Sequence, residues 1–162
     1  MHFSAEHRFS GPPSEAAAVL ADPGFYEGLE LPDVGRPEVV EHHTDGPGAA
    51  RILLRYEYTG HLDPIALRLL GGGSLVWTQE VRLAADHAGS LAFRAEANPT
   101  ALHGDAAFTL QADGEDTVRR LEGEIVVAIP LVGQMAEHRI VPGILARLDA
   151  EASAVEARLR LA

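Results

Sequence analysis

Apolar and polar residues alternate with a period of two along most of the chain, and only its last part follows the period of a helix. On one face of residues 2–9 lie Phe3, Ala5, His7 and Phe9. This alternation predicts a half-buried first strand. Six further strands are expected at 37–44, 50–59, 75–83, 90–97, 101–112 and 117–129.

Helical patterns occur in two places. Residues 16–21 and a second piece around Phe25 predict two short helices directly after the first strand, each bounded by proline. From about Leu131 onward one long helix is expected. Its apolar stripe consists of Val141, Leu145, Leu148, Ala152, Val155 and Leu159. Charged residues that include Arg147, Asp149 and Glu151 lie off this stripe, and Pro142-Gly143 predicts a kink.

These elements favour an α+β fold within one domain, residues 1–162. Short turns between successive strands predict antiparallel neighbours in a sheet of about seven strands. A curved sheet and one long helix bury their apolar faces most simply when the sheet wraps around the helix, and we expect that arrangement to leave a cavity.

Residues 59–74 do not fit the alternation. The segment is too apolar for an ordinary loop, and its glycines at 71–73 supply backbone freedom. Two interpretations remain open: a lid over the cavity, hinged at these glycines, or a short packed helix on a flexible tether.

Composition excludes several kinds of chemistry. The chain has no cysteine, and all thirteen basic residues are arginine, so thiolate and lysine chemistry are excluded. The net charge of −11 and the absence of clustered arginines argue against nucleic acid as a partner. No apolar run reaches the roughly 20 residues of a membrane span. We expect a cytoplasmic protein with no cofactor, and a homodimer remains possible.

Four short segments are similar to one bacterial branch of a larger superfamily. They are residues 32–35 (PDVG), 55–60 (RYEYTG), 77–80 (WTQE) and 129–133 (IPLVG). Together with the order of elements, they resemble the START-like (SRPBCC) helix-grip superfamily, in a branch known only as a domain of unknown function. The resemblance implies a hydrophobic cavity between the concave face of the sheet and the last helix. It does not imply one reaction, because carriers, receptors and cyclases share this scaffold.

Candidate ligand-binding residues follow from which side chains face that cavity. His7 shares a face with apolar neighbours, where a neutral imidazole either binds a ligand or is satisfied locally. Gln79 and Trp77 share another face, and an inward amide needs a partner from a ligand or a neighbouring strand. Tyr56 and Tyr58 join the site if their strand turns one way, and Arg55 if it turns the other. Further wall residues are expected at Phe93, Phe108, Ile125, Val141 and Leu145.

Residues 41–45 (EHHTD) are the stretch most similar to a metal cluster, but adjacent histidines on a strand face opposite ways. We therefore expect a solvated strand end there and no metal site. Hydrolase and dinucleotide-binding motifs are absent.

Three hypotheses for function remain. The leading one is a non-enzymatic binder of a hydrophobic small molecule, of lipid or polyketide-like type. The second is a cyclase or dehydratase in which His7 or a tyrosine acts as general acid or base. The third is an interaction protein whose interior is filled by its own side chains.

Overall fold

A computed structural model of the chain describes residues 1–69 and 73–161. Seven strands form one sheet in the order β1-β7-β6-β5-β4-β3-β2, and every neighbouring pair is antiparallel. The strands are β1 (His2–Ser10), β2 (Glu38–Thr44), β3 (Ala50–Glu57), β4 (Val76–Leu83), β5 (Ala88–Ala95), β6 (Leu102–Asp113) and β7 (Asp116–Val127). The expected α+β fold with seven antiparallel strands is confirmed.

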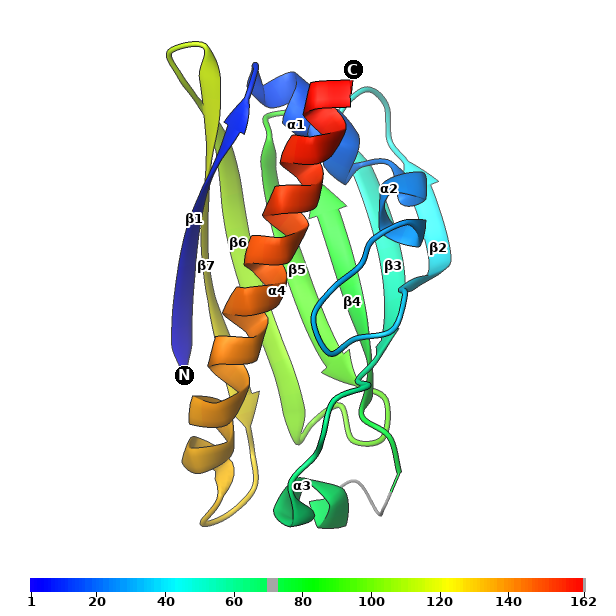
Figure 1. The fold of residues 1–162 in the computed structure, drawn as a ribbon, viewed down its shortest axis with the longest axis vertical. Coiled ribbons are helices and arrows are strands. Elements are labelled where there is room, and N and C mark those ends of the chain that lie inside the picture. The colour runs from blue at the N-terminus through cyan, green and yellow to red at the C-terminus, as the bar shows by residue number, and fades with distance from the viewer. Residues whose placement is uncertain (70–72, 162) are drawn as a thin grey trace.

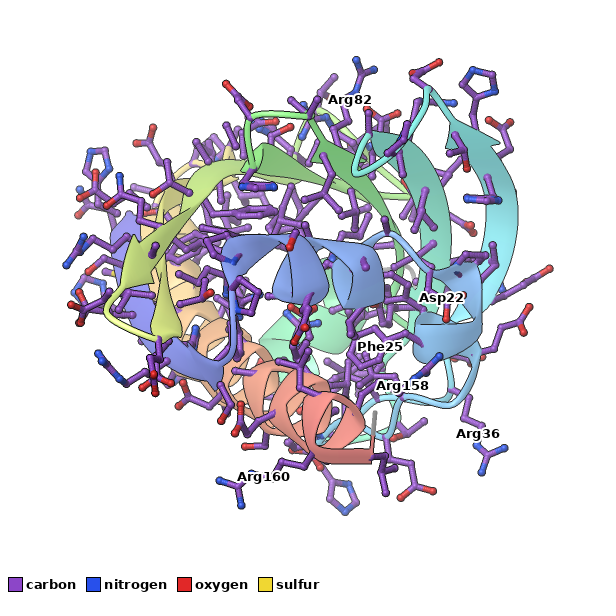
Figure 2. All side chains as sticks on the ribbon, turned by 90° about the horizontal axis from the view of Figure 1, so that it is seen from above. Asp22, Phe25, Arg36, Arg82, Arg158 and Arg160 are labelled. Carbon is purple, nitrogen blue, oxygen red and sulfur yellow. The ribbon has the colours of Figure 1, made fainter. Side chains whose placement is uncertain are left out.

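Four helices accompany the sheet in the described part of the chain. They are α1 (Pro13–Leu20), α2 (Pro23–Glu27), α3 (Pro64–Leu69) and α4 (Gly133–Leu161). The last helix runs along the concave side of the sheet, with α1 beside its C-terminal end and α3 near its N-terminal end (Figure 1). Seen from above, the sheet is an arc around α1 and α4, and side chains fill the space between (Figure 2).

Prolines determine where the two short helices α1 and α2 begin. Pro13 and Pro23 occupy the first turns of α1 and α2, where a missing backbone N–H costs nothing. The Asp22 carboxylate caps α2 by accepting from the N–H of Gly24 at 2.9 Å and also pairs with Arg158 of α4 at 2.7 Å. Figure 2 shows the side chains of Asp22 and Arg158 directed toward each other. The pair fixes the helical segment against the end of α4.

The inward faces of the strands agree with the alternation in the sequence. Phe3 and Phe9 of β1 are buried, as are Ile52, Leu54 and Tyr56 of β3. Arg55 points to the other face of β3 and pairs with Glu96 at 2.7 Å. The structure therefore decides the orientation that the sequence leaves open, in favour of the tyrosine face.

The long helix is continuous through Pro142, which lies inside it. Its buried residues are Gly133, Ile144, Leu148, Glu151, Ala152 and Val155. The prediction that Glu151 lies off the buried stripe is wrong, because this carboxylate neutralises a buried arginine described below. None of the described helices is long and apolar enough to cross a membrane.

Candidate functional site

A cavity of about 420 Å³ lies between the N-terminal half of α4 and the sheet ends nearest to α3. Its apolar wall combines residues from several strands, two loops and the helices: Val34, Leu62, Ala66, Leu75, Trp77, Phe93, Leu102, Ile125, Val132, Met135, Ile140 and Ile144. Its polar groups are Asp33, Tyr58, His61, Asp63, Arg94, His103, Arg139 and Arg147. An apolar chamber of this size with a few polar groups is typical of small-molecule sites, which measure about 300–1,000 Å³.

The helix wall of the cavity is formed by one face of α4. Ala136, Ile140, Gly143, Ile144 and Arg147 recur at spacings of three and four, so they share that face. Gly143 has no side chain, and a Cβ atom at this position would meet no atom within 4 Å. The missing side chain therefore contributes directly to the open space.

Arg147 lies inside the site, although the sequence pattern places it off the apolar stripe. Its guanidinium carbon is 4.6 Å from the centroid of the Trp77 ring, and Trp77 is stacked with Tyr56 at 5.4 Å between centroids. The Arg147 Nε–H donates to the carbonyl of Gly143, at a long 3.4 Å. Burial lowers the pKa of Arg147 from its ordinary value. Trp77 and Arg147 form the inner wall of the cavity, and Tyr56 supports Trp77 from the side of a smaller space.

A second, smaller space of about 20 Å³ adjoins this wall. Gln79, Tyr56, Arg147 and Glu151 supply its polar lining. The volume is enough for about one water molecule, which needs two to four polar partners. The amide of Gln79, a residue only 6% exposed, therefore faces an internal polar niche.

His7 belongs to a different cluster, on the β1 side of α4. The Arg119 guanidinium donates to Nδ1 of His7 at 3.1 Å, so His7 carries its proton on Nε2 and donates to Asp149 at 2.9 Å. Arg119 is 1% exposed and pairs with Glu151 at 2.7 Å. Burial, and then the charge of Arg119, lower the pKa of His7. Both ring nitrogens are engaged, and His7 does not line the cavity.

The cavity rim carries an ion pair between Arg139 of α4 and Asp63, the residue before α3. Asp63 also accepts from the N–H of Ala66 at 2.8 Å and thereby caps α3. Residues 61–63 and Ala66 thus form part of the wall, as expected for a segment that borders the cavity. The proposed hinge at Gly71 and Gly72 lies outside the described residues, and the lid remains a prediction.

The sequence-predicted site residues separate into three groups. Tyr58, Trp77, Phe93 and Ile125 line the main cavity. Tyr56 and Gln79 line the adjoining niche, together with Phe93. Outside both lie His7, Phe108, Val141 and Leu145. The Phe108 ring occupies the space that a Cβ atom of Gly89 would take. Val141 and Leu145 are partly buried against the core.

Most polar residues of the site were not among the sequence candidates, and they include Arg147, His61, His103 and Arg139. The sequence does contain a signal that Arg147 faces the site, because Arg147 follows Ile140 and Ile144 at helical spacing. Arg119 likewise alternates with Leu121 and Ile125 on β7. His61 lies in a loop and His103 near the start of β6, where the alternation of polar and apolar residues does not indicate which way a side chain points.

Residues 41–45 lie at the exposed end of β2. His43 pairs there with Asp45 at 2.8 Å, and Glu41 pairs with Arg51 at 3.1 Å. Across the described residues, no group of three or more histidine, aspartate or glutamate side chains is arranged to hold a metal ion.

The curved sheet and the long closing helix make up a START-like helix-grip fold. Solved structures with this fold include a START superfamily protein from Mycobacterium smegmatis (15% identity, 99% of this chain and 97% of the other, TM-score 0.61). The protein TTHA0849 from Thermus thermophilus is also similar (15% identity, 99% and 98% coverage, TM-score 0.71). The di-domain ARO/CYC StfQ from the steffimycin biosynthetic pathway is matched over 46% of its length (15% identity, 99% of this chain, TM-score 0.54).

A family model described as "Protein of unknown function (DUF2505)" matches residues 4–159, and the chain belongs to that family. The expected resemblance to a START-like branch of unknown function is confirmed. None of the curated proteins matches the chain.

Proposed function

We propose that the protein binds a hydrophobic small molecule, of lipid or polyketide-like type, in the cavity between the sheet and α4. The observation that carries this proposal is the cavity of about 420 Å³ with its largely apolar wall. Such a volume accommodates a compound of a few hundred daltons. It also favours binding over the alternative of an interior filled by the protein's own side chains.

Binding has more support than acid–base catalysis by the residues that the sequence nominates. Both ring nitrogens of His7 are engaged, and the residue lies outside the cavity. Burial, and then the nearby Glu151, raise the pKa of Tyr56, so its phenol stays protonated at neutral pH and cannot serve as a base. The base of a cyclase or dehydratase reaction would therefore be a group other than His7 or Tyr56.

The first test is native mass spectrometry of freshly purified protein, followed by organic extraction of any bound compound. We expect a discrete adduct of a few hundred daltons. Trp77 is the sole tryptophan and lines the cavity, so its fluorescence reports on binding of the extracted compound without a label.

A cavity-filling variant makes this test specific to the site. Gly143→Leu adds a side chain to the open cavity face of α4, where nothing obstructs its Cβ. Ala157→Leu adds leucine to the same helix at an exposed position and serves as the matched control. We expect loss of the adduct in the first variant alone. Equal adducts in both variants would place the compound elsewhere and contradict the proposal.

A further inference from the structure

Among the arginine side chains that the structure describes, only Arg147 forms no ion pair with a carboxylate. Every other arginine whose side chain the structure describes forms an ion pair with an aspartate or a glutamate. For Arg147, the described contacts are the face of Trp77 and a long hydrogen bond to the Gly143 carbonyl. Its guanidinium therefore keeps most of its donors unused while it lines the cavity and the niche.

Trp77 supports Arg147 through the face of its ring. The residue is 7% exposed, and among the described residues its Nε1 is the one fully buried side-chain polar atom without a hydrogen-bond partner. This N–H is closed to the cavity as well as to solvent. The donors that an acceptor in the cavity can reach are therefore those of the Arg147 guanidinium, which stacks on the ring.

Two carboxylates of the site, one in the niche and one at the rim, are paired with arginines other than Arg147. Glu151 is the buried carboxylate of the niche, and its Oε1 is 2.7 Å from Nη1 of Arg119. These two buried charges neutralise each other. Arg139, the other α4 arginine at the cavity, is neutralised by Asp63 at the rim. Glu151 acts on Arg147 electrostatically and Asp33 also lines the cavity, but neither forms an ion pair with the Arg147 guanidinium.

We propose that Arg147, stacked on Trp77, binds the carboxylate of an amphipathic organic acid whose apolar part fills the cavity. This inference rests on the proposed function and names the class of its ligand. A guanidinium presents a planar pair of N–H donors that matches a carboxylate, and it keeps those edges available while stacked on an aromatic ring. The inner end of the cavity then recognises the head group, and the apolar wall accepts the hydrocarbon.

The experiment compares matched acids and neutral analogues by isothermal titration calorimetry at neutral pH. One pair is dodecanoate with dodecan-1-ol, and a second is 2-naphthoate with methyl 2-naphthoate. We expect wild-type protein to bind the acid of at least one pair about tenfold or more tightly than its neutral analogue, the range of a hydrogen bond to a charged group.

Substitutions assign that preference to individual donors. Arg147→Met keeps the length of the side chain but removes the charge, and we expect loss of the acid preference with retained binding of the neutral analogue. Arg147→Lys keeps the charge without the planar fork and is expected to retain part of the preference. Trp77→Phe keeps a ring beneath the guanidinium and removes the buried N–H, and we expect most of the preference to remain.

Arg139→Met tests the rim arginine, which pairs with Asp63. Arg160→Met is the matched control, because it removes an exposed arginine of the same helix that pairs with Glu156 outside the cavity. We expect the preference of both variants to equal that of the wild type. If Arg139→Met loses the preference as fully as Arg147→Met does, the rim charge and not Arg147 selects the acid, and the inference is wrong.

Two further outcomes separate the inference from the proposed function. Equal binding of acid and neutral analogue by the wild type would overturn the carboxylate site and leave the hydrophobic cavity intact. Absence of binding for both members of both pairs, with no compound in the native protein, would overturn the proposed function and this inference with it.

Discussion

Buried charge in this protein is concentrated in a few residues beneath α4. His7 contacts Arg119 and Asp149, and the cluster is completed by Glu151. The imidazole accepts from a cation on one side and donates to a carboxylate on the other, so the neutral form fits both neighbours. Protonation of Nδ1 would remove the acceptor and set two positive charges against each other.

The first prediction concerns pH. The pKa of His7 is lowered in the folded protein, so between that pKa and about 6.5 the unfolded chain binds more protons. The stability due to neutral His7 is full above about pH 6.5 and is lost as the pH falls through that window. We expect the free energy of unfolding in urea to fall more steeply from about pH 7.5 to about pH 5 in wild type than in His7→Gln.

Asp149→Asn serves as a control for the His7 experiment, because this exposed carboxylate contributes to raising the pKa of His7 and not to lowering it. Its removal should preserve or strengthen the acid sensitivity. Parallel pH profiles for wild type and His7→Gln would show that the imidazole titrates alike in both states.

At the scale of elements, α4 presents two adjacent faces to the rest of the molecule. Of the predicted stripe, Leu148, Ala152 and Val155 are buried, whereas Val141 and Leu145 are only partly buried. In the N-terminal part of the helix the buried face is rotated toward Ile144, because the cavity wall and the packed core both lie on the sheet side. A helix with alanine at many positions leaves that rotation ambiguous in the sequence.

The second prediction uses two leucines of α4 that are three residues apart. Leu148 is 5% exposed and belongs to the core, and Leu145 is only partly buried. We expect Leu148→Ala to lower the free energy of unfolding by about 2–5 kcal/mol, as for other buried leucines. Leu145→Ala should cost clearly less. Chemical denaturation measures both, and a larger cost for Leu145→Ala would mean that Leu145, and not Leu148, faces the core.

At the scale of the whole molecule, the two ends of α4 differ in packing. Between Ile144 and Val155 the helix has five buried residues, whereas from Gly133 to Gly143 only Gly133 is buried. The C-terminal half is also tied to β1 through Ser10 and Glu156, and to the α2 cap through Asp22 and Arg158. The N-terminal half covers the cavity.

The third prediction is therefore a gradient of amide exchange along α4. Pro142 has no N–H and leaves the carbonyl of His138 without its helical donor, so we expect the amides of 136–143 to exchange faster than those of 148–155. A ligand in the cavity should slow exchange in the first group and leave the second unchanged. Hydrogen exchange read by mass spectrometry checks this, and uniform protection along the helix would contradict it.

Much of the fold and part of the site follow from periodicity alone. Alternation places Trp77, Gln79 and Tyr56 on inward faces, because successive side chains of a strand point to opposite sides. It does not say how far along the curved sheet the helix crosses. His7 and Phe108 also face inward, but neither meets the cavity. His7 contacts Asp149 of α4, and Phe108 packs against Gly89 of the neighbouring strand β5.

The sequence by itself determines the strands, their antiparallel order and the helix that closes them, because these depend on local periods and short connections. Only the tertiary structure decides which inward residues meet empty space and which meet one another. That choice depends on the position and rotation of α4 against the sheet. The same placement brings Arg147 onto Trp77 and Glu151 onto Arg119, contacts between residues far apart in the sequence that no local pattern encodes.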